Sequence, residues 1–221
     1  MTAEPGATRT ERRKAASRAS LLKAAQAYMA EGNTGIAVLD ITKRADVGLG
    51  TFYNHFSSKE ELFDAAVENA MEVHAAFLDL LVPEDDDPAR IFAQRFRLAG
   101  RMHRLEPELS KVILNRGVSL MDSDLGFTPR ARRDVQRAMA SGRFFALDVE
   151  IAMALVFGAA LGLGQLLHSQ PDRDDAQAAD AATAALLRML GMSDVEAAEI
   201  SASALPGLPD DFVQATEPGS A

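Results

Sequence analysis

Apolar residues recur three and four positions apart along nearly the whole chain, and no stretch alternates regularly between apolar and polar side chains. The first spacing collects apolar side chains on one face of a helix, whereas alternation is typical of a half-buried strand. The sequence therefore predicts an all-α protein. The first part of the chain is expected to hold a helix over residues 9–30 and two short helices over 38–45 and 49–55.

Short sequence signals place the ends of these first helices. Gly32 stands where a left-handed residue would end the first helix. A tight turn at 46–48 separates the two short helices, which is the arrangement of a helix-turn-helix. Ser58 and Glu61 have the spacing of a capping box, in which each side chain bonds the backbone amide of the other residue. A long helix that ends near residue 81 is expected to begin there.

The second part of the chain is longer and is also predicted to be helical. Proline and acidic residues at 83–88 interrupt the pattern and indicate a solvated connection. Further helices are expected over 89–105, 108–116, 129–140, 148–168, 174–190 and 194–204. The last sixteen residues contain three prolines and two glycines and are expected to be disordered. These features predict a first domain of residues 1–58, a second domain of 59–205 and a tail of 206–221.

The composition is that of a globular protein large enough to bury a core, with 221 residues, 48% of them hydrophobic and 25% charged. Cysteine is absent, which excludes disulfides, thiolate catalysis and Cys-ligated zinc or iron–sulfur sites. The first twenty residues are polar and basic, so no secretory signal is expected and the predicted location is the cytoplasm. The apolar run 151–164 is shorter than the roughly 20 residues of a membrane span and is expected to be a helix buried between other helices.

Charge is distributed unevenly along the chain. The net charge is -9, yet residues 1–59 contain nine basic and five acidic residues. The other 14 basic and 27 acidic residues lie in 60–221. A basic first part joined to an acidic second part suggests one unit that binds nucleic acid and another with a different task. A basic helix face that is simply solvated is the alternative.

A compact motif includes and follows the predicted turn. From Gly48 the chain reads GLGTFYNHFSSKEEL, which contains Thr51-Phe52-Tyr53, His55-Phe56 and Lys59-Glu60-Glu61-Leu62. This segment resembles the DNA-binding domain of the TetR family of bacterial transcriptional regulators, and the close resemblance covers residues 9–65.

The resemblance implies an N-terminal three-helix DNA-binding head with a helix-turn-helix, joined to a larger helical bundle for ligand binding and dimerisation. It implies a homodimer on a palindromic double-stranded DNA operator, and a repressor that a small apolar or amphipathic effector releases from that operator. The chain departs from the family at Asp46, where glycine is usual, and at Ala37 and Leu39, where threonine and arginine are common. Aspartate tolerates the left-handed conformation, so the turn is expected to be preserved.

The third helix can also be interpreted by the chemistry of its residues. Phe52 and Phe56 share one face and are expected to point inward. The residues then left outward are Gly50, Thr51, Asn54 and His55. Asn54 can pair with adenine, Thr51 can contact a phosphate or a thymine methyl group, and Gly50 permits close approach of the backbone.

Further DNA contacts are assigned from the family's pattern. The resemblance implies that Tyr53, His55 and Lys59 donate hydrogen bonds to phosphates. Leu49 is either a core residue or a thymine contact, since it shares the spacing of the buried phenylalanines. The remaining candidates for phosphate contacts, with a solvated surface as the alternative, are Lys43, Arg44, Arg12, Arg13, Lys14 and Arg18.

The helix over 89–105 has two unlike faces. One face is a polar stripe that is expected to meet solvent, formed by Arg90, Gln94, Arg97, Arg101 and Arg104. The opposite face meets a core, which in a helical bundle is either filled or holds a ligand. The resemblance favours a ligand cavity, with simple aromatic packing as the alternative for each residue. The candidate lining residues are Phe92, Phe96, Ala99, His103, Met121, Phe127, Phe144, Phe145 and Phe157.

Two helices rich in small residues are candidates for pairing two copies of the chain. The helices over 148–168 and 174–190 could form a four-helix seam across a two-fold axis. The residues assigned to this interface are Gly158, Ala160, Gly162, Ala181, Ala184, Ala185, Leu186 and Met189. The alternative is that both helices belong to the core of one chain.

The sequence contains no clear catalytic or metal-binding pattern. The segment 162–164 lacks the third glycine and the preceding strand of a dinucleotide loop. His74, His103 and His168 are far apart and lack the spacing of metal ligands. No metal, cofactor or enzymatic activity is therefore predicted.

The predicted function is a DNA-binding regulator, and the alternative is a helical ligand-binding or interaction protein that does not act on DNA. For the regulator, a ligand that displaces the helix over 108–116 is expected to tilt the long helix before it. That tilt would change the spacing of the two recognition helices in a dimer.

Overall fold

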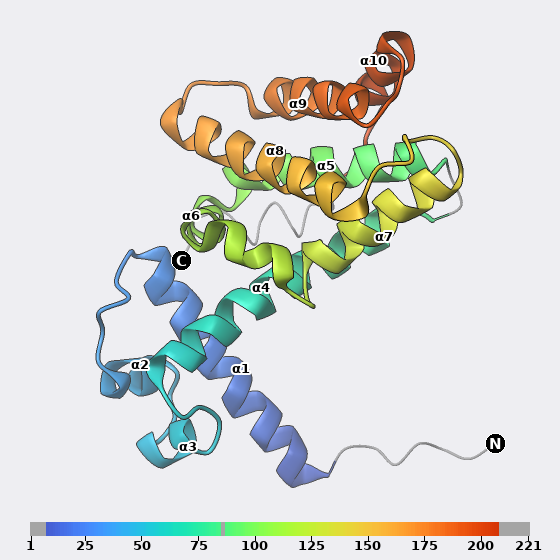
Figure 1. Cartoon of the computed structure of the whole chain (residues 1–221). Helices are drawn as coiled ribbons and strands as arrows, with labels where there is room; N and C mark the ends of the chain where they lie inside the picture. Colours follow the sequence, from blue (N-terminus) through green and yellow to red (C-terminus); the bar gives the residue numbers. More distant parts are fainter. Residues whose placement is uncertain (1–7, 85–86, 208–221) are drawn as a thin grey trace, which may run out of the picture. The chain divides into compact units, whose positions relative to one another are not determined.

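The computed structural model describes residues 8–84 and 87–207, and within these ranges it contains helices and no strand (Figure 1). The all-α prediction is therefore confirmed. The chain forms two compact units, which we call the N-terminal unit (Met1–Ala70) and the C-terminal unit (Met71–Ala221). The boundary lies inside helix α4 (Lys59–Leu81) and not before it, because the first turns of α4 bury apolar side chains in the core of the N-terminal unit.

The N-terminal unit contains α1 (Arg9–Ala30), α2 (Val38–Arg44), α3 (Leu49–Tyr53) and the first turns of α4. At the start of α1, Thr8 and Glu11 form a complete capping box. At its end, Gly32 has a φ of 68° and the Asn33 amide donates to the Tyr28 carbonyl at 2.9 Å. The predicted left-handed end of the first helix is confirmed.

The turn of the helix-turn-helix uses the same geometry without glycine. Asp46 has a φ of 53°, and the Val47 amide donates to the Thr42 carbonyl at 3.0 Å. The aspartate thus adopts the conformation expected for it, and the turn is preserved. Helix α3 ends at Tyr53, two residues earlier than predicted, because the chain turns at residues 54 and 55.

Helix α4 begins with only half of the predicted capping box. The Glu61 amide donates to the Ser58 hydroxyl at 3.1 Å, as expected. The Glu61 carboxylate, however, accepts from the backbone amide and the hydroxyl of Ser57, each at 2.6 Å. The predicted return bond to the Ser58 amide is wrong, because the side chain reaches one residue further back.

The C-terminal unit contains the rest of α4 and seven further elements. They are α5 (Pro88–Leu105), α6 (Pro107–Arg116), a 3₁₀ helix η1 (Gly117–Asp122), α7 (Phe127–Ala140), α8 (Val149–Ser169), α9 (Asp175–Met189) and α10 (Asp194–Ala202). The six predicted α-helices are present, whereas η1 was not predicted. Helix α5 is central, since it packs on α7, α8 and α9 (Figure 1).

The prediction that the polar stripe of α5 faces solvent is wrong for Arg97. Arg97 is only 3% exposed, and its guanidinium binds Asp180 of α9 at 2.7 Å and the Ser203 carbonyl at 2.8 Å. Arg101 lies 3.3 Å from the same carboxylate. Arg97 can be buried because an acidic residue of α9 neutralises it, while the other members of the stripe are half-buried, namely Arg90, Gln94, Arg101 and Arg104.

The connection between α4 and α5 is more than the solvated segment that was predicted. Asp87 caps α5 through the Ala89 amide at 3.1 Å and also binds Arg143 at 3.0 Å. Glu84 binds Arg137 at 3.0 Å. The acidic residues at both ends of the segment thus hold α7 and the chain after it. Asp85, Asp86 and most of the predicted disordered tail, 208–221, lie outside the described residues.

Helix α8 is buried on one face only. Among the described residues it is the single helix that is long and apolar enough to cross a membrane by length and composition, and only 28% of its most apolar window is buried within the chain. Met153 and Val156 face the core, whereas Ile151 is 53% exposed. Within one chain, the prediction of a helix buried between other helices therefore holds for one face only.

Candidate functional site

The N-terminal unit presents an exposed face on α3. Phe52 and Phe56 are buried, as predicted, and they anchor the helix to the core. Tyr53 is 59% exposed and Leu49 is 45% exposed, so Leu49 is not a core residue. Four of the predicted contact residues therefore lie on one accessible surface, namely Leu49, Gly50, Tyr53 and Asn54.

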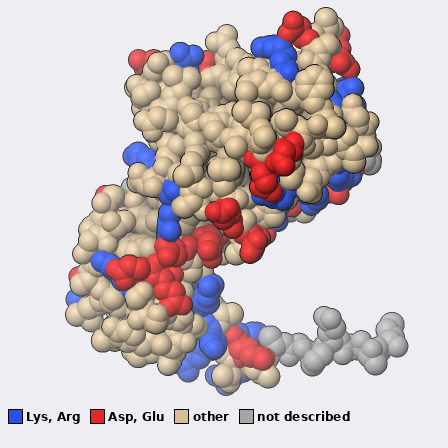
Figure 2. All heavy atoms as spheres, in the orientation of Figure 1, with Lys and Arg blue, Asp and Glu red and all other residues tan. Residues whose placement is uncertain are grey.

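The predicted cations around this face differ in what they bind. Arg13 is exposed on α1, and the exposed Lys43 side chain lies 3.3 Å from Asp40. Arg44 pairs with Glu31 at 2.7 Å and lies 4.6 Å over the Tyr28 ring. Figure 2 shows basic side chains gathered over the N-terminal half of α1. Arg44 thus ties the end of α2 to α1, while the first half of α1 carries accessible positive charge.

Two predicted phosphate donors already have partners within the unit. The Lys59 ammonium donates to the Ile36 carbonyl at 3.3 Å. His55 Nε2 lies 2.8 Å from the Ser17 hydroxyl on α1. Burial, followed by the charges of Lys14 and Arg18, lowers the pKa of His55. A neutral His55 therefore fastens the end of α3 to α1, and Thr51 beside it is half-buried.

The exposed face has the chemistry of a nucleic-acid interface. A carboxamide, a phenol and a leucine side chain lie close together at the end of a short helix, with the backbone accessible at Gly50. A carboxamide can form two hydrogen bonds with adenine in the major groove, and the phenol can donate to phosphate.

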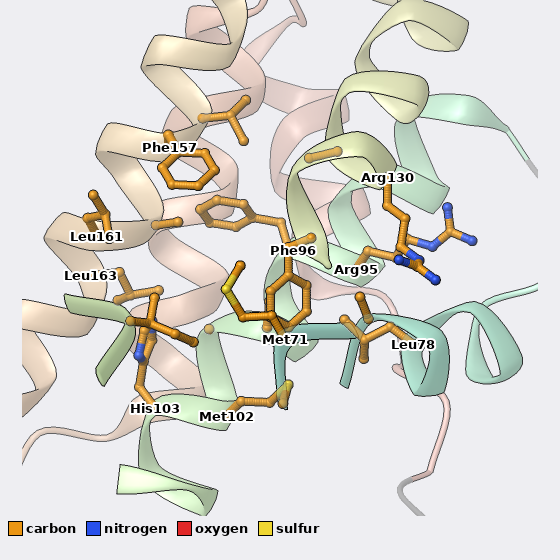
Figure 3. A pocket seen from close by; sticks show the side chains of 18 of the residues that line it. Met71, Leu78, Arg95, Phe96, Met102, His103, Arg130, Phe157, Leu161 and Leu163 are labelled. Carbon is orange, nitrogen blue, oxygen red and sulfur yellow. The ribbon is translucent and has the colours of Figure 1, made fainter. Parts of the chain in front are cut away.

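The C-terminal unit contains a partly open cavity of about 140 Å³ with largely apolar walls from α4, α5, α6, η1, α7 and α8 (Figure 3). An engineered apolar cavity of about 150 Å³ is large enough to bind benzene. The cavity is therefore of the size of a single aromatic ring.

Six of the nine predicted lining residues line this cavity, namely Phe92, Phe96, Ala99, His103, Phe127 and Phe157. Met121 does not line it. Phe144 is buried behind Phe92, edge-on at a ring distance of 5.4 Å. Phe145 is 65% exposed and covers Gly191, where a Cβ would lie 2.5 Å from its ring. These last two residues are adjacent in the loop after α7, and neither side chain reaches the cavity.

One end of the cavity is charged, which the sequence did not predict. Arg95 of α5 donates to both carboxylate oxygens of Asp134 of α7 at 2.7 Å. Arg130 of α7 binds Glu72 at 2.8 Å and Asp79 at 2.5 Å, both on α4. Hydrogen bonds from Arg130 hold the pKa of Glu72 down, to about 2. This end is a set of neutralised ion pairs that joins three helices.

The other end of the cavity carries hydrogen-bonding side chains from α5, α6 and α8. His103 Nδ1 lies 2.6 Å from the Ser110 hydroxyl, and His168 Nε2 lies 2.8 Å from the same oxygen. Burial, followed by the charge of His168, lowers the pKa of His103 to about 4. In Figure 3, His103 lies on one side of Phe96, and Arg95 and Arg130 lie on the other.

The structure brings together two histidines that are 65 residues apart in the sequence, counted from position 103 to 168. Their distance in the sequence gave no sign of this contact, and neither Ser110 nor His168 was among the predicted site residues. The described part of the chain contains no cluster of three or more His, Asp or Glu residues that could hold a metal ion. A third histidine, His74 of α4, lies 2.5 Å from Glu106 at the start of α6.

A second surface lies outside the cavity, on α8 and α9. Five residues of the predicted interface are exposed there, namely Gly158, Gly162, Ala181, Ala185 and Met189. A Cβ built on either glycine would meet no atom within 4 Å. Ala160 is different, because it lines the cavity, so its assignment to this exposed surface is wrong. Leu186 is buried in the core of its own chain. Figure 2 shows a largely uncharged surface over α8, with acidic side chains near one end of the helix.

Comparison with known families gives two matches that together cover most of the chain. Residues 21–66 match the family described as bacterial regulatory proteins, tetR family. Residues 87–203 match the Tetracyclin repressor-like C-terminal domain. The first match includes α2, α3 and the turn between them, and the second includes all of α5 to α10.

Individual relatives agree with these matches. The chain is similar to RolR, solved with the ligand resorcinol, with 33% identity over 90% of this chain and 99% of that chain and a TM-score of 0.70. A segment of 38 residues is 53% identical to the HTH-type transcriptional repressor DhaR of Mycobacterium sp. (strain GP1), and it spans 17% of this chain and 19% of that relative. FadR from Bacillus subtilis, solved with stearoyl-CoA, has 18% identity over 79% of this chain and 99% of that chain and a TM-score of 0.59, which shows the shared fold.

Proposed function

Because the chain belongs to the TetR family of bacterial regulatory proteins, we propose that it is a homodimeric transcriptional repressor that a small aromatic molecule releases from its DNA operator. The observation that carries this proposal is the pairing of an exposed helix-turn-helix face in one unit with a partly open, ring-sized cavity in the other. The chain needs no catalytic step and no cofactor for this activity, and its operator DNA places it in the cytoplasm.

Operator recognition is assigned to the exposed face of α3. Asn54 reads a base edge in the major groove, Tyr53 and Lys43 hold phosphates, and Leu49 contacts an apolar part of the groove. Their exposure and the basic N-terminal half of α1 support this assignment. His55 and Arg44 act mainly by fixing α3 and α2 on α1, since their side chains bond within the unit.

Dimerisation is assigned to the exposed faces of α8 and α9. A helix of five residues offers too few base contacts for a selective site, and two copies related by a two-fold axis double them on a palindromic operator. The apolar and largely uncharged surface over α8 would be costly to leave in water. Small side chains at 158, 162, 181 and 185 allow the helices of two copies to approach closely.

The effector is assigned to the class of single-ring aromatic compounds that carry a polar group. The cavity is of the size that holds benzene, its walls are apolar, and each end has polar side chains. RolR, which is similar to this chain over nearly its whole length, was solved with resorcinol, a benzene ring with two hydroxyl groups.

The switch is assigned to α6, which forms one wall of the cavity. Its residues Leu109, Ser110 and Ile113 line the cavity, and Glu106 at its start binds His74 of α4. A ligand that moves α6 would pull on α4, which continues into the N-terminal unit. The two recognition helices of a dimer must lie about 34 Å apart to enter successive major grooves, so a small tilt of α4 would weaken binding.

The test is fluorescence anisotropy with a labelled duplex from the DNA upstream of the gene, with a random duplex as the control. We expect binding that is strong for the upstream duplex, weaker for the random duplex, and weakened by added resorcinol. Asn54→Ala should reduce the preference for the upstream duplex by roughly 1–3 kcal/mol without changing random binding. Equal affinity of the wild-type protein for both duplexes would contradict operator recognition and favour a ligand-binding protein that does not act on DNA.

A further inference from the structure

The end of the cavity that contains His103 has an unusual hydrogen-bond arrangement. Ser110 of α6 is buried, and its hydroxyl lies within 2.8 Å of nitrogens from two histidines, His103 of α5 and His168 of α8. Ser110 and His103 both line the cavity, so their shared hydrogen bond is accessible from it. A ligand in the cavity can therefore compete for this bond.

The direction of each hydrogen bond follows from the number of available protons. The His103 ring also forms a hydrogen bond with the backbone of Ala160, whose carbonyl can only accept. A neutral His103 has one N–H group, and that group is used for Ala160, so Nδ1 is an acceptor. Ser110 must then donate its proton to His103 Nδ1, and its oxygen accepts from His168 Nε2.

The position of the His103 ring is fixed by a glycine. A Cβ on Gly164 would lie 2.5 Å from Cε1 of His103, so only glycine leaves room for the ring against α8. The Ala160 carbonyl lies one turn earlier on the same helix. These two contacts hold His103 in place independently of Ser110, and His103 Nδ1 stays directed toward α6.

We propose that this end of the cavity is a hydroxyl subsite, in which a phenolic hydroxyl of the effector replaces the Ser110 hydroxyl as the donor to His103 Nδ1. The subsite rests on the proposed effector cavity and adds the chemical group that the effector must carry. The bound hydroxyl donates to His103 and can accept from Ser110, which matches the single proton and the lone pairs of a phenol.

This arrangement discriminates between classes of aromatic ligand. An ether, a ketone or a carboxylate can only accept, so it would place an acceptor against the Nδ1 lone pair. A carboxylate would also have to leave water for a cavity with largely apolar walls, where buried His103, with a pKa of about 4, is neutral and cannot form an ion pair with it. A hydrocarbon would leave the Ser110–His103 bond intact and gain nothing from it.

The exchange of hydrogen bonds also explains how ligand binding can displace α6. Ser110 is the fully buried residue among the residues of α6 whose side chains are described. A ligand hydroxyl that lies between Ser110 and His103 must increase their separation from 2.6 Å, because each contact needs its own hydrogen-bond length. The first turn of α6 therefore moves away from α5 when the subsite is filled.

The test compares phenol with toluene, which has a methyl group in place of the hydroxyl, by isothermal titration calorimetry on the full-length protein. In the wild-type protein we expect phenol to bind about tenfold more tightly than toluene, as one net hydrogen bond would give. In Ser110→Ala, His103 Nδ1 has no protein donor to displace, so phenol should bind a further several-fold more tightly, on the order of fivefold, while toluene is unchanged. Ser119→Ala removes an exposed hydroxyl from the adjacent 3₁₀ helix and should change neither affinity.

A second variant should lower the ratio of phenol to toluene affinity instead of raising it. His103→Leu removes the acceptor, so phenol and toluene should bind with the same affinity within about twofold. Loss of packing alone would change both probes alike in either variant, and circular dichroism checks that each protein is folded. If the ratio of phenol to toluene affinity is the same in wild type, Ser110→Ala and His103→Leu, the hydroxyl subsite is wrong, although toluene binding would still support the effector cavity. If neither probe binds to the wild-type protein, the effector cavity and the subsite are both wrong.

Discussion

The ion pair between Arg95 and Asp134 gives a stability prediction whose size follows from burial. Arg95 is 7% exposed and Asp134 is 3% exposed, and both carboxylate oxygens accept from the guanidinium at 2.7 Å. Asp134→Leu keeps the volume of the side chain but leaves part of a buried cation without its partner. Removal of one member of a buried pair typically costs about 3–5 kcal/mol.

The expected loss lies at the lower end of this range. Asp79 remains 3.0 Å from Arg95 and Glu84 remains 3.6 Å away, so the cation keeps some compensation. We expect a loss of about 3 kcal/mol, which for a chain of this length lowers the Tm by roughly 6–12 °C. The control is Glu150→Ala, which removes the partner of Arg132 in an exposed pair and should cost less than about 1 kcal/mol.

The assay is thermal and urea unfolding at one protein concentration, because the stability of a dimer depends on concentration. The double variant Arg95→Met with Asp134→Leu separates the charge from the packing. With no cation left to compensate, the double variant should be more stable than Asp134→Leu alone. A double variant that is less stable than Asp134→Leu would refute the explanation by an unpaired buried charge, and so would equal losses for Asp134→Leu and Glu150→Ala.

Two further predictions concern assembly and pH. Ala185→Glu should convert the dimer to monomer in sedimentation velocity, since it places charge in the proposed seam. The control Ala140→Glu, at the exposed end of α7, should leave the dimer intact. A dimer from both variants would exclude α9 from the interface. Stability should fall as the pH is lowered from about 6.5 to about 4, because the unfolded chain binds a proton that buried His103, with its lowered pKa, does not. His103→Leu should show a flatter urea-unfolding profile over this window, and parallel profiles for the two proteins would contradict the assigned pKa.

The N-terminal unit could be predicted from the sequence because its determinants are local. The end of α1 depends on Gly32, the turn depends on Asp46, and the inward face of α3 depends on phenylalanines four residues apart. Each of these signals lies within a few residues of the structure that it determines. The part that could not be predicted is which polar side chains bind each other, as for His55 and Ser17, which are 38 residues apart.

The C-terminal unit was predicted less well because its polar contacts link distant parts of the chain. Arg97 and Asp180 are 83 residues apart, and Ser110 and His168 are 58 apart. Nothing in the local pattern distinguishes Arg97, which is buried, from an arginine in solvent. The error at Ala160 was of another kind and could have been avoided, because two residues along a helix correspond to a rotation of about 200°. Ala160 therefore cannot share the face of Gly158.

The distribution of these polar contacts suggests which wall of the cavity moves. Ion pairs from Arg95 and Arg130 join α4, α5 and α7 at the charged end, and separation of these helices would expose buried charge. Helix α6 is held near the cavity by the hydrogen bonds of Ser110 and by Glu106, which bonds His74. The contact between Glu106 and His74 is an ion pair when His74 is protonated, but the hydrogen bonds of Ser110 can be exchanged for equivalent bonds to a ligand, so displacement of α6 needs less free energy than displacement of the other walls.

A ligand can shift the protein between two states only by its difference in affinity for them. An exchange of one hydrogen bond at Ser110 gives a difference of about tenfold, or about 1.4 kcal/mol, between the ligand's affinities for the two states. With the cavities of both subunits filled, the equilibrium between the states would shift by about a hundredfold. This magnitude is sufficient to release a repressor whose operator sites are partly occupied. It would be too small to move α5 or α7 against their ion pairs. Helix α6 is the movable wall because hydrogen bonds hold it where ion pairs hold α4, α5 and α7. For the same reason, the effector's hydroxyl, rather than its ring, is the group that determines release from DNA.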